Sequence, residues 1–279
     1  MKNKMLRAVA CVLALALAAA LTAGCGFISR ASNGDIVIAG GELYEVNDRE
    51  ALDLQGVDRI SISGVSDKVT VRVGKEPTAE LTGQCRSVGD PVKLEVSKAG
   101  GKLIVEVKYP NNVIRSSNTD LVVTLPEEYE GGLSASTVSG GIVATSLPLK
   151  LAQVHLNTVS GGIQFNASCE SLEAGTISGS VEIGGITGPT TVTTVSGEVV
   201  LAYDKAADTK VDTVSGSVGA RVPKDASFQI DFSSVSGSFR SSHSGINVSK
   251  AGSGFSASVG EGGALIKVST TSGSFKLEE

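Results

Sequence analysis

The hexapeptide TVSGGI stands at residues 137–142 and again at 158–163, and close variants of it follow along the rest of the chain. The variants are TISGSV at 176–181, TVSGEV at 194–199, TVSGSV at 213–218, SVSGSF at 234–239 and TSGSF at 271–275. Apart from hydroxyl groups, these residues carry no groups suited to catalysis or metal binding. The useful signal is therefore their spacing.

The Gly of each Ser-Gly pair recurs at a nearly constant interval. These glycines stand at 140, 161, 179, 197, 216, 237 and 273, so the gaps are 21, 18, 18, 19, 21 and 36 residues. A period of this size is typical of stacked repeats, in which a single unit cannot bury its apolar face alone. We interpret the gap of 36 as two periods, with a degenerate copy at residues 253–254.

Within each unit, the apolar positions change parity just before the Val-Ser-Gly segment. Leu172 and Ala174 share one parity, whereas Ile177, Val181 and Ile183 share the other. A strand cannot change its buried face without a bend, so each unit is predicted to be two short strands that meet at a corner. A variable polar loop then leads to the next coil.

Stacked coils would lie about 4.8 Å apart, the spacing of neighbouring strands. Equivalent residues would then form ladders, with Val138 and Ile142 pointing inward and Ser and Gly at the corner. Glycine suits a corner where two backbones approach closely. The prediction is an all-β, single-chain β-solenoid, resembling a parallel β-helix, with about 18–21 residues per coil over 133–279.

Residues 43–132 contain short alternating runs such as KVTVRV at 68–73 and KLIVEVKY at 102–109. This is the pattern of half-buried strands, and we expect an N-terminal β region that supplies the first coils and a cap. At the other end, the charges of FKLEE at 275–279 would discourage end-to-end pairing of strands.

The first 24 residues read as a secretory signal peptide, with a basic start and an uncharged apolar run at 8–24. LTAGC at 21–25 resembles the lipobox of bacterial lipoproteins, although Thr22 stands where Leu is more usual. We therefore predict that Cys25 is lipidated and that residues 25–42 form a lipidated tether. The alternative is an ordinary signal peptide, or an uncleaved anchor, with an incidental cysteine.

Removal of the signal peptide takes away three positive charges and changes the net charge from −5 to −8. This balance argues against nucleic acid and anionic lipid headgroups as partners. Two cysteines, Cys85 and Cys169, remain in the body of the chain. An exported location would permit a disulfide between them, but they could equally be two small buried side chains.

The chain lacks the sequence signatures of the common catalytic sites. Its two histidines, His155 and His243, are far apart in sequence, and no zinc-protease, phosphate-loop, nucleophile-elbow or dinucleotide motif occurs. We therefore expect a protein that is not an enzyme, with no metal and no cofactor. Glu182 and Glu198 lie in consecutive units but at different offsets from Gly179 and Gly197, so they form no obvious ladder. A carbohydrate-active enzyme with a pair of carboxylates is the second alternative.

Three segments resemble a known family: GVDRISISGVSDKVTVRV from residue 56, DLVVTLPEEYEGGLSASTVSGGI at 120–142, and the recurring TVSGxV. Together they look like the bacterial putative adhesins of the DUF4097 type. The resemblance implies a β-solenoid at the cell envelope and no established catalytic residues.

The combined expectation is an exported, lipid-anchored, non-catalytic β-solenoid on the extracytoplasmic side of a membrane. It would act as an adhesin or an envelope scaffold, with an envelope polymer or a protein as its partner. The alternative is an accessory or sensor component of an envelope-stress system.

Overall fold

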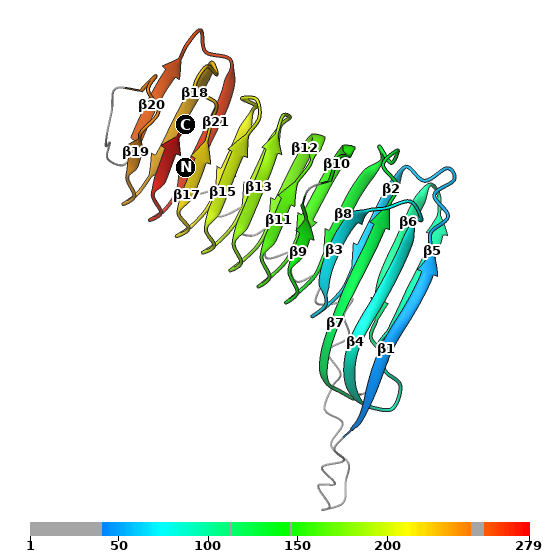
Figure 1. Cartoon of the computed structure of the whole chain (residues 1–279). Helices are drawn as coiled ribbons and strands as arrows, with labels where there is room; N and C mark the ends of the chain where they lie inside the picture. Colours follow the sequence, from blue (N-terminus) through cyan, green and yellow to red (C-terminus); the bar gives the residue numbers. More distant parts are fainter. Residues whose placement is uncertain (1–40, 112, 146, 247–253) are drawn as a thin grey trace, which may run out of the picture.

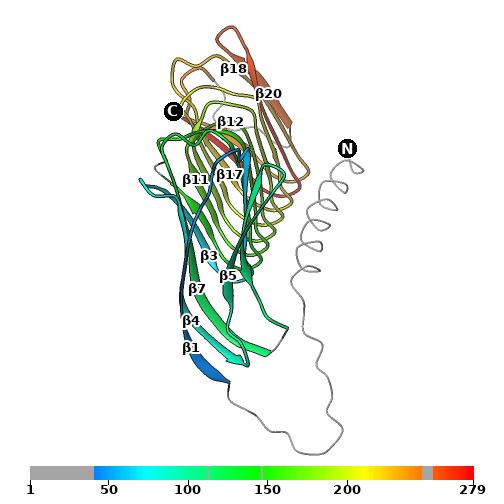
Figure 2. The same ribbon diagram turned by 90° about the vertical axis from the view of Figure 1, so that its right-hand side faces the viewer.

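In a computed structural model, the chain folds into a rod of stacked β-coils (Figure 1). The structure describes residues 41–111, 113–145, 147–246 and 254–279, and every regular element among them is a β-strand. The strands form two 11-stranded sheets that face each other across the core (Figure 2). The predicted all-β solenoid is confirmed, whereas the signal peptide, Cys25 and almost all of the predicted tether lie outside the described residues.

Neighbouring strands are hydrogen-bonded in the order β1 to β19 in sheet 1 and in the order β20 to β5 in sheet 2. Sheet 1 consists of β1 (Glu42–Ala51), β4 (Thr78–Val88), β7 (Val113–Leu125), β3 (Lys68–Val73), β9 (Ile142–Ala144), β11 (Ile163–Asn166), β13 (Val181–Ile186), β15 (Val199–Tyr203), β17 (Val218–Arg221), β22 (Phe275–Glu278) and β19 (Phe239–Ser241). Sheet 2 consists of β20 (Gly254–Val259), β18 (Phe228–Ser234), β21 (Ala264–Thr270), β16 (Thr209–Asp212), β14 (Thr190–Thr193), β12 (Ser168–Gly175), β10 (Lys150–Asn157), β8 (Gly132–Ser136), β2 (Arg59–Ser63), β6 (Lys102–Lys108) and β5 (Lys93–Ala99).

Each regular coil has one strand in sheet 2, a tight corner and one strand in sheet 1. Successive coils pair in parallel and in register, so that Ile163 lies opposite Val181 and Phe165 opposite Ile183. These side chains are almost fully buried between the sheets. Burial of such an apolar side chain stabilises the folded state by about 1.5–3 kcal/mol. The stacked apolar side chains are therefore the main source of stability.

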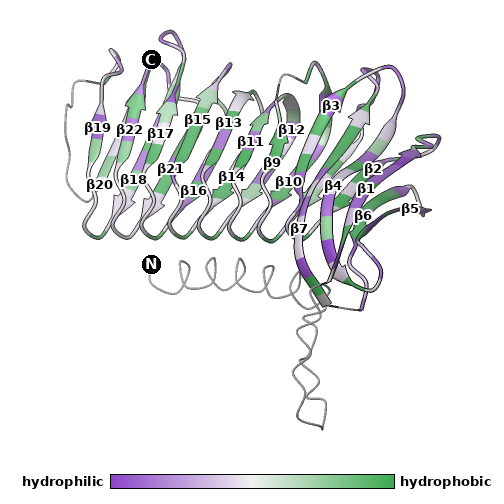
Figure 3. Ribbon diagram, turned by 60° about the horizontal axis from the view of Figure 1, so that its bottom comes forward, coloured by the Kyte–Doolittle hydropathy of each residue, from purple (hydrophilic) through white to green (hydrophobic). Residues whose placement is uncertain are grey.

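The corners line up along one edge of the rod, and the longer loops lie along the other (Figure 3). This arrangement follows from the repeat, because the corner has a constant length while the loop does not. Strands β1, β4 and β7 run past the row of corners at one end of the rod.

The N-terminal region contains both regular coils and a cap. The coil β2–β3 pairs in parallel with β8 and β9, which continue the stack. Coil β6–β7 pairs in parallel with the other side of β2 and β3, although it comes later in the chain. Outside it lie β5, β4 and β1, which pair antiparallel.

At the C-terminal end, the coils do not stack in the order of the sequence, which is the order that the repeat predicts. The last strands, β21 and β22, pair on one side with β16 and β17 and on the other with β18 and β19. The segment that follows residue 263 is therefore the penultimate coil, and coil β18–β19 lies outside it. The gap of 36 residues reflects this reversal of order.

The proposed degenerate copy at residues 253–254 is wrong. Gly254 begins β20, which pairs antiparallel with the outer side of β18 and forms no corner. The expectation that the charges of residues 275–279 protect the end of the rod is also wrong, because β22 is an interior strand. Within the described part of the chain, no helix is long and apolar enough to span a membrane.

Candidate functional site

Each regular corner is held by a hydrogen bond between the first and fourth residues of a tetrapeptide such as Thr-Val-Ser-Gly. The Gly N–H donates to the hydroxyl of the Thr three residues earlier, at 3.0 Å for Gly161 and Thr158 and at 3.1 Å for Gly197 and Thr194. The corresponding distances at Gly140, Gly179, Gly216 and Gly273 are 3.2, 3.0, 3.0 and 2.8 Å. We call each corner, from its Thr or Ser to the apolar residue two positions after Gly, a rung.

The prediction that the Val138 side chain points inward is wrong. Thr137 is buried, with 3% of its surface exposed, whereas Val138 is only half-buried. The same holds at Thr158 and Val159. The inward face therefore changes within the rung and not before it, because the Thr hydroxyl has to reach the amide that the bend leaves without a partner. Ile142 points inward as predicted.

Glycine is required in the rung because each backbone crosses closely over the rung before it. A Cβ on Gly161 would lie 1.8 Å from the Gly140 carbonyl oxygen, and a Cβ on Gly179 would lie 1.7 Å from that of Gly161. Real Cβ atoms do not approach backbone oxygen so closely. The absence of a side chain is therefore what lets the corners stack.

Successive rungs are joined by a repeated set of backbone hydrogen bonds. The N–H groups of Val159 and Ser160 both donate to the Val138 carbonyl, at 3.1 and 2.9 Å. In the opposite direction, Ile163 N–H donates to the Ser180 carbonyl of the next rung at 2.8 Å. In these backbone hydrogen bonds, each rung thus offers its successor the carbonyl of its second residue and the N–H of its sixth.

The first rung, in coil β2–β3, reverses the usual residues. Gly64 stands at the Thr position and Asp67 at the Gly position. The side chain that fills this corner therefore comes from the fourth residue, whereas in the regular rungs it comes from the first. The Asp67 carboxylate is fully buried and accepts from Val65 N–H at 3.0 Å. The segment GVSD at 64–67 is the sequence signal of this rung, with Asp67 two residues before the apolar Val69.

Two hydroxyl groups of the outer coil β6–β7 complete the environment of Asp67. Tyr109 donates to its carboxylate oxygens at 3.2 Å, and Thr119 donates to Asp67 Oδ1. Burial, and then the negative charge of Asp67, raise the pKa of the Tyr109 phenol. The phenol therefore stays protonated and acts as a donor, which links the cap to the first rung.

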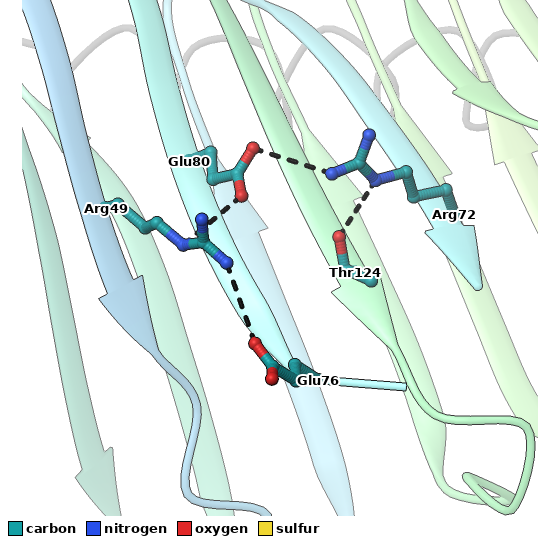
Figure 4. Close-up of polar contacts among 5 residues, drawn as sticks. All are labelled: Arg49, Arg72, Glu76, Glu80 and Thr124. Carbon is teal, nitrogen blue, oxygen red and sulfur yellow. Dashed lines mark hydrogen bonds and ion pairs between the residues drawn. The ribbon is translucent and has the colours of Figure 1, made fainter. Parts of the chain in front are cut away.

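Four charged residues form a network on the outer face of the cap (Figure 4). Arg49 lies 3.8 Å from Glu76 and 3.4 Å from Glu80, and Arg72 reaches Glu80 at 3.5 Å. Arg72 Nε also donates to Thr124 Oγ1 at 2.9 Å. The network crosses β1, β4, β7 and β3, but exposed ion pairs of this kind are each worth less than about 1 kcal/mol.

Cys85 and Cys169 are both free thiols. Cys85 lies on β4 in sheet 1 and Cys169 on β12 in sheet 2, five strand positions apart along the rod. At about 4.8 Å per strand this is roughly 24 Å, far beyond the Cα separation that a disulfide allows. Burial raises the pKa of the Cys169 thiol to about 11, so it is a poor nucleophile at neutral pH.

The polar residues considered as catalytic candidates are scattered. His155 is half-buried on β10 with its Nδ1 3.2 Å from Glu173, and His243 is buried edge-on against the Phe228 ring. Glu182 is exposed on β13 and accepts from Gln164, and Glu198 is exposed in the corner before β15. The burial that keeps a glycosidase acid protonated is absent at these two residues.

The described residues contain no cluster of three or more His, Cys, Asp and Glu side chains that could hold a metal ion. What the chain repeats is the rung, with its fixed hydrogen bonds and its close glycine contacts. The protein is thus a β-solenoid of two sheets with glycine-stacked corners.

The chain matches the Toastrack DUF4097 family over residues 57–187 and again over residues 150–278. It belongs to this family, as the resemblance predicted. The two overlapping matches together span the stack from its first rung to its last strand. Among curated proteins, none matches this chain.

Several solved structures are similar to this chain. A putative cell adhesion protein from Clostridium sporogenes is 11% identical, with a TM-score of 0.44, over 84% of this chain and 99% of that one. For a putative adhesin from Bacteroides fragilis the values are 10%, 0.42, 85% and 97%. For a putative lipid binding protein from Parabacteroides distasonis they are 16%, 0.43, 83% and 96%.

Proposed function

We propose that this protein is an exported, lipid-anchored, non-catalytic rod that acts as an adhesin or as a scaffold of the cell envelope. The observation that carries the proposal is the regular stack itself, a long rigid body without a metal cluster or an assembled catalytic pair among its described residues. A stacked repeat of this kind presents extended, periodic surfaces, which suit binding better than chemistry.

The position of the predicted lipid site agrees with an anchor at one end of the rod. Cys25 precedes the start of β1 by 17 residues, and β1 lies at the capped end. A chain of this length reaches at most about 60 Å when fully extended. The cap would then lie nearer the membrane, with the stack projecting away from it.

The charge of the mature chain limits the partner. A net charge of −8 disfavours nucleic acid and anionic lipid headgroups, so we expect a neutral or basic envelope polymer or protein.

The anchor is tested by expressing the full chain and its Cys25→Ser variant in a bacterium supplied with a clickable fatty acid. We expect the wild type to be labelled and to stay with the membranes, and the variant to lose both properties. The matched control is Cys11→Ser, which alters a cysteine within the signal peptide. Equal labelling of wild type and Cys25→Ser would contradict the anchor.

Adhesion is tested separately, by screening the purified body against arrays of envelope polymers, host glycans and matrix proteins. Saturable binding to one class supports the proposal. Binding to none of them, together with an unchanged envelope in a deletion strain, would contradict both the adhesin and the scaffold.

A further inference from the structure

The outer faces of the two sheets differ in the middle of the rod. On sheet 1 the outward residues include Val143, which is half-buried, and Val200, which is 41% exposed. On sheet 2 the outward residues of residues 132–136, 153–157 and 171–175, in the neighbouring strands β8, β10 and β12, are all polar or glycine: Gly132, Ser134, Ser136, Gln153, His155, Asn157, Ser171, Glu173 and Gly175. This part of sheet 2 therefore offers hydrogen bonds in place of apolar contacts.

The parallel register arranges these residues in rows that run along the rod. His155 lies opposite Ser134 on one side and opposite Glu173 on the other. In the next row, Asn157 lies opposite Gly175. Neighbours within a row are about 4.8 Å apart, the spacing of the strands. A ligand that lies along the rod would therefore meet polar groups from several coils at once.

Two glycines make room for long side chains to lie flat against this face. A Cβ on Gly132 would lie 3.1 Å from Arg59 Nε, and a Cβ on Gly175 would lie 2.7 Å from Asn157 Oδ1. The Arg59 and Asn157 side chains thus occupy the space that side chains at the two glycines would take. Arg59 reaches across β8 to β10, where its Nη2 donates to Gln153 Oε1 at 2.9 Å.

The hydrogen bonds among these side chains fix their orientation and leave other polar groups free. The Glu173 carboxylate accepts from His155 Nδ1 at 3.2 Å, so His155 Nε2 has no partner among the described residues. Gln153 uses its Oε1 for Arg59 and keeps its side-chain N–H groups available. The side-chain amide of Asn157 also has no hydrogen-bond partner in the described part of the chain. Strand β10 therefore presents free polar groups at three successive outward positions, held in place by their neighbours.

We propose that this polar cluster, Arg59, Gln153, His155, Asn157 and Glu173, binds a neutral, hydroxyl-rich polysaccharide that lies along the rod. Sugar hydroxyls both donate and accept, and the cluster offers both kinds of group. Arg59 and Glu173 contribute one charge of each sign, which gives no preference for a charged polymer. The net charge of −8 on the mature chain disfavours a polyanion. The inference rests on the proposed function and names the class of its envelope partner.

A protein partner fits this face less well. The strands β8, β10 and β12 are each paired on both sides, so an extended peptide finds no open strand here to join. The face also lacks the exposed apolar and aromatic side chains that form the centre of most protein interfaces. A hydroxyl-rich polymer needs neither an open strand nor an apolar patch.

The probes are fluorescent oligosaccharides of dextran, mannan and chitin, and binding to the purified full chain is measured by fluorescence anisotropy. Dextran sulfate of the same length is the charged control, because it has the same sugar backbone. We expect saturable binding of at least one neutral probe and weaker binding of the sulfated dextran. The inference is overturned if no neutral probe binds saturably, or if dextran sulfate binds more tightly than the neutral probes.

Matched variants of the two sheets test the location. Gln153→Ala removes an exposed glutamine from the cluster, and Gln164→Ala removes an exposed glutamine of the same coil from the outer face of sheet 1. Glu173→Gln and Glu182→Gln form a second pair, because Glu173 holds His155 and Glu182 holds Gln164, both at 3.2 Å. We expect the sheet 2 variants to weaken binding by about fivefold or more and the sheet 1 variants to leave it unchanged. Equal effects of the two members of each pair would show that the polysaccharide does not bind at the polar cluster.

The outcomes separate this inference from the proposed function. If the full chain binds a protein of the envelope or the host but no neutral glycan, the inference is wrong and the adhesin or scaffold stands. If it binds neither, and deletion leaves the envelope unchanged, both are wrong.

Discussion

At the N-terminal end of the rod, β1, β4 and β7, of 10, 11 and 13 residues, extend past the corners and pair antiparallel with one another. At the C-terminal end, β20, with 6 residues, covers sheet 2, and sheet 1 ends at β19, with 3 residues. The N-terminal edge strand β1 carries four acidic residues and Arg49, whereas β20 has the uncharged sequence GFSASV.

The two ends also differ in the contacts that hold their interiors together. The N-terminal end uses polar links: Asp67 binds hydroxyls of the outer coil, and Asp48 accepts from Leu94 N–H at 2.9 Å and so joins β1 to β5 across the two sheets. The C-terminal end uses aromatic packing, with the Phe239 and Phe255 rings stacked at 4.4 Å. Charged residues and long strands protect the N-terminal end from pairing with other strands, whereas packed aromatic rings close the core at the C-terminal end.

The largest effect is expected from a substitution in the middle of the rod. It tests whether both ends depend on one continuous stack of rungs. Gly179→Ala places a Cβ 1.7 Å from the Gly161 carbonyl oxygen, and the two rungs would have to separate. We expect a loss of more than about 4 kcal/mol in the free energy of unfolding, or failure to fold. Gly219→Ala, whose nearest neighbour is 3.9 Å away, should change it by less than about 1 kcal/mol. Urea denaturation measures both, and similar values would refute the ladder.

The second effect is specific to the C-terminal end. Phe239→Ala removes a fully buried ring that packs on Phe232, Phe255 and Phe275, and we expect a loss of about 3–5 kcal/mol. Hydrogen exchange followed by mass spectrometry should show faster exchange in β18 to β22 and little change in β1 to β7. Equal loosening of the N-terminal cap would mean that the two ends are not independent.

The third effect is specific to the N-terminal end. Asp67→Gly leaves the hydroxyls of Tyr109 and Thr119 without their acceptor, at a cost of about 2–3 kcal/mol. Gly64→Thr adds a Cβ 2.8 Å from Asp67 Oδ2 and is also expected to destabilise the protein. The double variant restores the usual rung, so its destabilisation should be smaller than the sum of the two by about 1–2 kcal/mol. Additive free energies of unfolding would contradict the reversed rung.

The smallest effect concerns the surface network of the cap. Glu80→Gln removes the carboxylate shared by Arg49 and Arg72, and we expect a loss of less than about 1 kcal/mol in the free energy of unfolding. The difference from the wild type should fall further in 1 M salt, where the Debye length is about 3 Å. A difference that persists at high salt would mean that the network is more than a set of screened ion pairs.

The period of the Ser-Gly pairs was enough to predict the coils, their corners and the place of glycine in them. This succeeded because a parallel stack repeats the same contacts in every coil, so that local sequence and global fold carry the same pattern. The reversed rung at Gly64–Asp67 lies outside this pattern, because its first and fourth residues are exchanged and it therefore lacks the Ser-Gly pair. The prediction that Val138 points inward was wrong because the neighbouring Thr137 turns inward, where its hydroxyl serves the backbone, and apolar patterning does not report this role.

The sequence by itself determined the fold class, the length of a coil and the family, because each follows from a repeated local pattern. Only the tertiary structure decided the order of the coils at the two ends, where β6–β7 lies outside β2–β3 and β18–β19 lies outside β21–β22. It also decided the separation of Cys85 from Cys169 along the rod. The reason is that any rung can pair with any other, so the choice of neighbour at each end depends on long-range contacts such as those of Asp67 and Phe239, which have no period in the sequence.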